Sequence, residues 1–222
     1  MKRVQDVVRD WAGKNYYTLV RSNASHRKSW MDHVTAVKGE KELLLNHCEA
    51  CQIISAVTAT EKLGGHLAEV GVAYGASAKL IAQYAGARSL HLFDTFEGLP
   101  EIAQIDGDKF HKGQFRSNVD VVKKYVDHPQ AHYYKGLFPS TADPVRDLRF
   151  SFVHLDVDLY ESTIAGLRFF YPRLLTGGIL ISHDFLSAEG VNAAFSEFFA
   201  DKPEPVIELT GYQCMIVKTG AA

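Results

Sequence analysis

Short apolar runs alternate with amphipathic segments along most of the chain beyond Gly65. Short apolar runs bounded by turn residues predict buried strands, and the segments between them carry apolar residues at helical spacing. Because strands and helices alternate, the pattern predicts an α/β fold with a mostly parallel sheet. The predicted strands are His66–Val70, Ser89–Phe93, Ala131–Tyr134, Phe150–Leu155 and Gly178–Ser182. The predicted helices are Ala76–Ala85, Val119–Val126, Ser162–Tyr171 and Glu189–Phe199.

The two ends of the chain depart from this alternation. Val206–Leu209 and Gln213–Val217 predict two tightly joined strands, which would add an antiparallel strand to the sheet. Residues 1–64 predict helices around a polar loop at Arg21–Ser29, and we interpret them as a helical lid or as a layer covering one face of the sheet. This segment is rich in aromatic residues: Trp11, Tyr16, Tyr17 and Trp30. We therefore expect an N-terminal helical cover on a ligand-binding domain, residues 65–222, with both parts in one compact unit.

The composition excludes several classes of protein. Lys plus Arg total 24 against 26 for Asp plus Glu, so the chain has no basic excess to hold a nucleic-acid backbone. The segment Met1–Arg9 lacks the apolar core of a signal peptide, and no apolar run reaches membrane-spanning length. An odd count of 3 cysteines fits a reducing compartment. We expect a cytoplasmic protein with neither a nucleic-acid nor a membrane partner.

Two further features have competing interpretations. Cys48 and Cys51 have the C-x-x-C spacing of redox or zinc sites, but Glu42–Lys62 predicts a helix and no second Cys or Cys/His pair follows nearby, which favours buried helix thiols. Thr95–Arg116 is a long connection, and loops of this length often cover functional sites. His111 on this loop is a candidate to face a substrate.

A glycine-bearing turn follows the first predicted strand and leads into a helix through Gly71, Gly75 and Ser77. Glycines at such a turn let the backbone approach a ligand closely. Glu69 precedes the turn, where its carboxylate would repel a dinucleotide pyrophosphate and attract a cation. The ammonium and sulfonium groups of S-adenosylmethionine fit this site better than NAD does.

The second predicted strand leads directly into Asp94, Thr95 and Phe96. A carboxylate at this position can accept hydrogen bonds from both ribose hydroxyls of a nucleotide. Phe96 is then placed to stack beside the adenine, and Thr95 belongs to the same candidate cofactor site. The other interpretation of Asp94 is a turn or helix-capping residue.

Ionisable residues also gather after two later strands. Asp156 and Asp158 are two positions apart, so their side chains point the same way, and His183-Asp184 follows the next strand. If these strands are neighbours, the groups meet where open α/β sheets bind ligands. Asp156 and Asp184 suit a divalent metal, with Asp156 also near the cofactor, and Asp158 is the candidate base. The alternative is a set of helix caps and a histidine with ordinary hydrogen bonds.

Four stretches of the chain resemble the macrocin O-methyltransferase family, whose members methylate deoxysugar hydroxyls on macrolides and related antibiotics. The similarity spans roughly residues 65–200 and is carried by Glu69–Gly75, Leu92–Pro100, His154–Thr163 and Tyr171–Leu174 with Gly177-Gly178. It implies the doubly wound, seven-stranded sheet of class I methyltransferases, whose last strand is antiparallel. It also implies a homo-oligomer.

The resemblance implies roles for individual residues. Glu69 and Asp94 would contact S-adenosylmethionine, Asp156 and Asp184 would bind magnesium, and Asp158 would act as the base. Similar enzymes commonly carry two aspartates where this chain has His183-Asp184. Imidazole binds transition metals better than magnesium, so His183 is either a third metal ligand or the group that takes the proton.

The sequence therefore predicts an S-adenosylmethionine-dependent O-methyltransferase acting on a sugar or another small polyhydroxylated acceptor. Two other functions stay open. One is a nucleotide-dependent oxidoreductase, which the charge of Glu69 disfavours. The other is a catalytically silent, methyltransferase-like binding module, which would gain nothing from crowded carboxylates.

Overall fold

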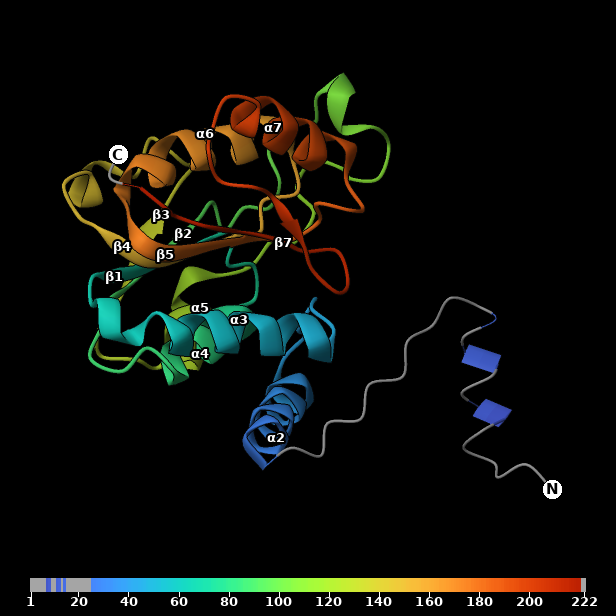
Figure 1. The fold of residues 1–222 in the computed structure, drawn as a ribbon, viewed down its shortest axis with the longest axis vertical. Helices are drawn as coiled ribbons and strands as arrows, with labels where there is room; N and C mark the ends of the chain where they lie inside the picture. The colour runs from blue at the N-terminus through green and yellow to red at the C-terminus, as the bar shows by residue number, and fades with distance from the viewer. Residues whose placement is uncertain (1–6, 9–10, 13, 15–24, 221–222) are drawn as a thin grey trace.

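The computed structural model describes residues 7–8, 11–12, 14 and 25–220. In this part of the chain, a seven-stranded sheet has the order β3-β2-β1-β4-β5-β7-β6, and only β7 runs antiparallel to its neighbours (Figure 1). The predicted α/β fold, with its mostly parallel sheet and antiparallel last strand, is confirmed. The strands are β1 His66–Val70, β2 Leu90–Asp94, β3 Ala131–Lys135, β4 Phe150–Leu155, β5 Leu174–Ser182, β6 Ile207–Glu208 and β7 Cys214–Val217.

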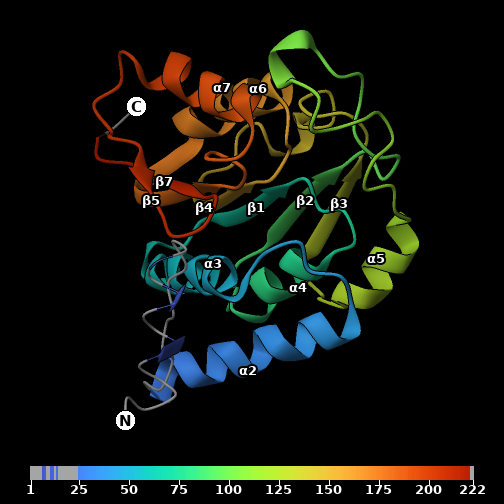
Figure 2. The same ribbon diagram turned by 90° about the vertical axis from the view of Figure 1, so that its right-hand side faces the viewer.

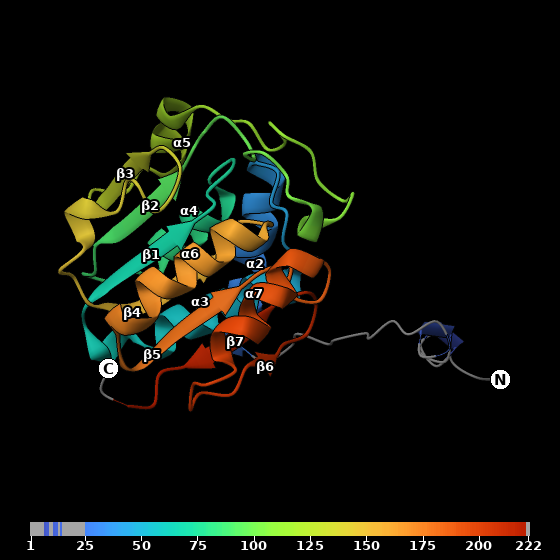
Figure 3. The same ribbon diagram turned by 90° about the horizontal axis from the view of Figure 1, so that it is seen from above.

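Helices cover both faces of the sheet, as Figures 1 and 2 show. On one face α3, α4 and α5 pack against the strands and α2 lies outside α3 and α4, while α6 and α7 cover the other face (Figure 3). Both sides of the central strands are buried: every residue of β4 is buried, and so is every residue of β1 except the half-buried His66. The helices are α2 Ser25–Glu40, α3 His47–Ala59, α4 Ala76–Gln83, α5 Val119–Val126, α6 Tyr160–Phe170 and α7 Glu189–Phe199.

The strand order changes direction between β1 and β4. The chain winds from β1 outward to β2 and β3, and then returns to place β4 and β5 on the other side of β1. In open parallel sheets, this reversal leaves a crevice outside the carboxyl ends of the two central strands, where ligands bind. The fold therefore places the residues after β1, β2, β4 and β5 around one crevice.

The described part of the N-terminal segment forms a helical layer. The side chains of Ile53, Ile54 and Val57 on α3 are buried against the sheet. The expected loop at Arg21–Ser29 is wrong from Ser25 onward, where α2 begins. Tyr16 and Tyr17 lie outside the described residues, and the division of the chain at residues 64 and 65 stays a prediction.

The helix α3 is shorter than the predicted helical stretch Glu42–Lys62. It begins after Asn46, whose side chain accepts the N–H groups of Cys48 and Glu49, because this capping box stops the helix from extending backwards. Cys51 is buried on α3 and Cys48 is half-buried, so the two thiols lie on a helix as expected. Among the described residues, no helix combines the length and the apolar character needed to cross a bilayer.

The long connection after β2 is anchored against the helices α6 and α7. The buried Asp106 accepts the N–H of Tyr160, at the start of α6, over 2.7 Å. Gly190 of α7 approaches so closely that a Cβ there would overlap the Asp106 carboxylate. The loop is also closed on itself, because a Cβ on Gly98 would overlap the backbone of Gly113. Its residues therefore form a fixed wall beside the crevice.

Three histidines cluster near the opposite, amino-terminal end of the sheet. The imidazole of His91 lies 3.0 Å from Nδ1 of His66 and 2.9 Å from the hydroxyl of Tyr134, and it stacks on His132. Burial lowers the pKa of His91 to about 4, and the neighbouring His66 and His132 add to this effect. The folded protein therefore holds His91 as a neutral group.

This cluster predicts a loss of stability on mild acidification. An unfolded histidine has a pKa near 6.5, so between that value and about 4 the unfolded chain binds more protons and the free energy of unfolding falls as pH falls. We expect a loss on the order of 2 kcal/mol between pH 7 and pH 5 in urea denaturation. His91→Phe should flatten this dependence, whereas His111→Asn, at an exposed position, should not. Equal slopes for the two variants would contradict the assignment.

Candidate functional site

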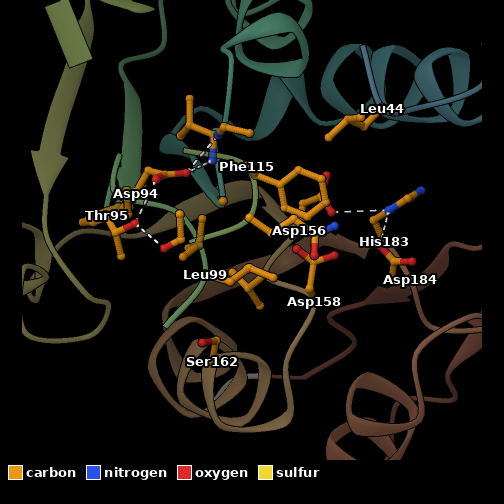
Figure 4. Close-up of a pocket in the computed structure, with 18 of the residues that line it drawn as sticks. Leu44, Asp94, Thr95, Leu99, Phe115, Asp156, Asp158, Ser162, His183 and Asp184 are labelled. Atoms are coloured by element: carbon orange, nitrogen blue, oxygen red, sulfur yellow. Dashed lines mark hydrogen bonds and ion pairs between the residues drawn. The ribbon is translucent and has the colours of Figure 1, made fainter. Parts of the chain in front are cut away.

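A cavity of about 310 Å³ opens over the carboxyl ends of β1, β2, β4 and β5. Asp94 and Thr95 lie at one end of it, and His183 and Asp184 lie at the other, with Asp156 between them (Figure 4). The sequence placed all of these residues at strand ends, and the structure brings them to the wall of a single cavity.

The glycine-bearing turn after β1 forms the floor of the first end. Gly71 has φ +87°, and a Cβ there would overlap the carbonyl of Asp156, so β1 and the end of β4 come together only at a glycine. The carboxylate of Asp94 accepts the N–H groups of Val72 over 2.7 Å and Ala73 over 2.9 Å. Asp94 therefore holds the turn against the end of β2.

Asp94 combines the two roles that the sequence left open. It is a turn-stabilising residue, since its second oxygen accepts the N–H of Phe96 over 2.5 Å, and it also lines the cavity. Burial raises the pKa of Asp94, while the N–H groups of Phe96, Ala73 and Val72 counteract that rise. Each carboxylate oxygen has two lone pairs, so acceptor capacity remains for a ligand hydroxyl.

Four of the predicted cofactor residues line the cavity: Gly71, Asp94, Thr95 and Asp156. Four others do not. Gly75 faces α5, where a Cβ would meet Val122, and Ser77 is buried at the start of α4. Phe96 is 3% exposed and belongs to the core cluster below the sheet, because its φ of +54° turns it away from the cavity. Leu99 and Phe115 of the same loop line the cavity instead.

Glu69 lies within the sheet and outside the cavity wall. Its carboxylate is fully buried and lies 2.8 Å from Nδ1 of His154 on the neighbouring strand β4. Burial raises the pKa of Glu69, and the hydrogen bond with His154 opposes that rise. The expected contact between Glu69 and a cofactor cation is therefore not a direct one in this geometry.

Asp156, His183 and Asp184 meet at the other end of the cavity. Nδ1 of His183 lies 2.7 Å from Oδ2 of Asp184 and 3.3 Å from Oδ1 of Asp156, and one donor atom from each residue lies within 4.8 Å of the others. Figure 4 shows the three side chains converging. Two carboxylate oxygens and one imidazole nitrogen so close together fit a divalent ion.

The electrostatics of this cluster are strongly coupled. Burial alone would lower the pKa of His183, but the carboxylates of Asp156, Asp184 and Glu49 outweigh it and raise that pKa well above its usual value. Burial likewise opposes ionisation of Asp184, yet His183 and Lys109 lower its pKa below the ordinary range. The cluster is built to hold positive charge between its carboxylates.

Asp158 points into the middle of the cavity, next to Asp156 (Figure 4). It is 8% exposed and has φ +63°, a left-handed conformation that Asp tolerates better than most residues. Burial, followed by the charges of Asp156 and Asp184, raises its pKa well above the ordinary value. A carboxyl group with a raised pKa is a stronger base once it is ionised.

Several residues on the cavity wall had no signal in the sequence analysis. Lys109 of the long loop binds Oδ1 of Asp184 through a 2.7 Å ion pair, and it also donates to Ser187 over 2.9 Å. Leu44 and Tyr212 reach the cavity from segments far from the motifs. His111 is exposed and does not line the cavity, so the expectation that it faces a substrate has no support in this geometry.

The chain matches known proteins in sequence and in fold. The family model described as Macrocin-O-methyltransferase (TylF) matches residues 22–209. A relative from Streptomyces olivaceus, the 8-demethyl-8-(2,3-dimethoxy-alpha-L-rhamnosyl)-tetracenomycin-C 4'-O-methyltransferase, is 33% identical over 140 residues. That match covers 54% of this chain and 53% of the relative, which is about half of each protein.

Solved structures share the fold at low sequence identity. The O-methyltransferase NovP has a TM-score of 0.69 and 20% identity over 80% of this chain and 82% of its own. The calicheamicin methyltransferase CalS11 has a TM-score of 0.67 and 19% identity over 89% of this chain and 94% of its own. An O-methyltransferase from Bacillus cereus in complex with SAH has a TM-score of 0.60 and 12% identity over 96% and 97% of the two chains. Because the family model covers most of the sequence, the chain belongs to the macrocin O-methyltransferase family.

Proposed function

We propose that this protein transfers a methyl group from S-adenosylmethionine to a hydroxyl oxygen of a sugar or another small polyhydroxylated molecule. One observation carries the proposal: a single cavity joins the glycine-bearing turn after β1 to the acidic cluster after β4 and β5. Methyl transfer needs a donor site and an acceptor oxygen aligned in one enclosed space. The relatives support the acceptor class, since the Streptomyces olivaceus enzyme is named for a rhamnosyl tetracenomycin and CalS11 is described as a TDP-rhamnose 3'-O-methyltransferase.

The cofactor fits at the end of the cavity formed by Gly71, Asp94 and Thr95. Gly71 lets the turn close against the end of β4, and Oδ1 of Asp94 keeps acceptor capacity for a ribose hydroxyl. The same geometry disfavours a nucleotide-dependent oxidoreductase, because the N–H groups of Val72 and Ala73 that would bind a pyrophosphate already donate to Asp94.

Asp158 is the proposed general base. The acceptor hydroxyl loses its proton to the Asp158 carboxylate while a C–O bond forms and the C–S bond of the donor breaks. Burial and the charges of Asp156 and Asp184 raise the pKa of Asp158, which makes its ionised carboxylate a stronger base. His183 is the alternative acceptor, but a metal bound through its ring nitrogen would leave that nitrogen no lone pair for a proton.

Asp156, His183 and Asp184 are the proposed holders of a divalent metal. When bound, such an ion lowers the pKa of a coordinated hydroxyl, as it does for water. The apolar side chains of Leu99 and Phe115, together with Leu44, enclose the space between the two ends of the cavity (Figure 4). These apolar side chains would exclude water from the acceptor oxygen. The crowded carboxylates at the other end of the cavity argue against a catalytically silent binding module.

Calorimetry with S-adenosylhomocysteine tests the cofactor site. We expect the wild-type protein to bind it and Gly71→Ala to weaken binding by at least about tenfold, which corresponds to about 1.4 kcal/mol, because the added Cβ displaces the turn. Gly39→Ala on α2 is the matched control, since a Cβ there meets nothing within 4 Å. Absence of binding to the wild-type protein would overturn the proposed function.

Product formation from TDP-rhamnose and from rhamnosides tests the base. We expect Asp158→Asn to lower kcat about 100-fold to 10,000-fold, the usual contribution of a general base, without weakening S-adenosylhomocysteine binding. Asp108→Asn, which removes an exposed carboxylate, should keep wild-type activity. If Asp158→Asn keeps full turnover while His183→Ala abolishes it, then His183 is the base.

A further inference from the structure

Glu49 on α3 is a buried carboxylate that the proposed mechanism does not use. It is 2% exposed, and its Oε2 lies 3.6 Å from Nε2 of His183. Nε2 of His183 is buried and has no hydrogen-bond partner. The role of Glu49 in the capping box of α3 does not explain why its buried carboxylate faces the unpartnered nitrogen of His183.

The position of Glu49 is fixed from two sides. Its Oε2 accepts the N–H of Asn46 over 2.7 Å at the start of α3, and its Oε1 accepts the N–H of Tyr212 over 2.9 Å in the turn between β6 and β7. A Cβ on Gly211 would overlap the same carboxylate, so the turn reaches Glu49 only with a glycine there. The carboxylate is therefore held rigidly beside His183.

This arrangement determines which nitrogen of His183 faces the acidic cluster. Nε2 points to Glu49, while Nδ1 points to Oδ1 of Asp156 at 3.3 Å and to Oδ2 of Asp184 at 2.7 Å. A histidine that binds a metal usually donates its other N–H to a carboxylate, and this bond fixes the tautomer and the ring orientation. Glu49 is placed for this role, with its Oε2 at 3.6 Å from Nε2 of His183, slightly beyond hydrogen-bond distance.

We propose that Glu49 is a positioning residue that presents Nδ1 of His183 as a metal ligand, so that the centre prefers a transition ion such as Mn²⁺, Co²⁺ or Zn²⁺ over Mg²⁺. The proposal rests on the metal centre of the proposed function. Magnesium favours oxygen ligands, whereas imidazole suits transition metals.

The first experiment measures metal affinity and ligand type without an activity assay. Metal-free full-length protein is titrated with MgCl₂, MnCl₂ and CoCl₂ by calorimetry, and the Mn²⁺-loaded protein is examined by pulsed electron paramagnetic resonance for a directly bound ¹⁴N. We expect Mn²⁺ and Co²⁺ to bind at least about tenfold more tightly than Mg²⁺, with one nitrogen ligand. His183→Asp should remove the nitrogen signal and narrow the difference between Mn²⁺ and Mg²⁺.

The second experiment isolates Glu49. Glu49→Gln removes the charge beside His183 but can still serve in the capping box. Loss of a carboxylate that faces a ligating histidine should weaken Mn²⁺ binding about 10-fold to 100-fold. Glu208→Gln is the matched control, because Glu208 is an exposed carboxylate on β6. Unchanged affinity in Glu49→Gln would overturn the positioning role.

A third measurement serves if Glu49→Gln does not fold. Long-range ¹H–¹⁵N spectra of the Zn²⁺-loaded wild-type protein, with the His183 signals assigned through His183→Asn, show which nitrogen binds the metal. Coordination through Nδ1 supports the proposal, and coordination through Nε2 overturns it. S-adenosylhomocysteine binding is measured on the same samples. If the protein binds S-adenosylhomocysteine but shows no preference for transition ions, only this inference is wrong. If it does not bind S-adenosylhomocysteine, the proposed methyl transfer is wrong as well.

Discussion

The arrangement of the site depends on negative charge gathered at the carboxyl edge of a parallel sheet. Glu49, Asp156 and Asp184 all lie within 3.6 Å of one imidazole, and Lys109 binds the other carboxylate oxygen of Asp184. Carboxylates crowded in a partly dry space repel one another unless cations or protons separate them. The protein supplies two cationic side chains and raises the pKa of Asp158, so that the cluster can exist before any ligand arrives.

Backbone strain is concentrated at the same edge. Asp158 and Asp184 both have positive φ values, of +63° and +58°, immediately after the strands β4 and β5. A non-glycine residue in this region costs free energy and persists only where the surroundings hold it, which is typical of functional sites. Here the surroundings are the fully buried strand β4 and the bond between Lys109 and Asp184. The stable centre of the sheet therefore supports a strained and charged rim.

The sequence predicted the parts of this rim that follow from local periodicity. Asp156 and Asp158 are two residues apart after a continuous apolar run, so their placement at a strand end required only the alternation of side chains. Phe96 shows the limit of that reasoning, because its place next to Asp94 predicted a cofactor contact and its left-handed backbone turned it into the core. No periodic pattern reports a single residue's φ angle in a loop.

Glu49 and Lys109 were out of reach for a different reason. Glu49 is recognisable in the sequence only as the third helical residue of a capping box, and its contact with His183 depends on how α3 packs under β4 and β5. Lys109 reaches Asp184 only because Asp106 anchors the long loop to the start of α6. Contacts between residues so far apart in the chain are set by tertiary packing, and no local pattern in a single sequence reveals them.

The N-terminal helices therefore do more than cover the sheet. Glu49 of α3 contacts the acidic cluster, and Leu44, just before α3, lines the cavity. The turn before β7 contributes Tyr212 to the same wall and binds Glu49 through its backbone. A shift of α3 would consequently move Leu44 of the cavity wall and the Glu49 carboxylate beside His183 at the same time. The fit of the proposed acceptor and the geometry of the proposed metal site are thus coupled through one helix, whose first turn is held in place by the capping box of Asn46.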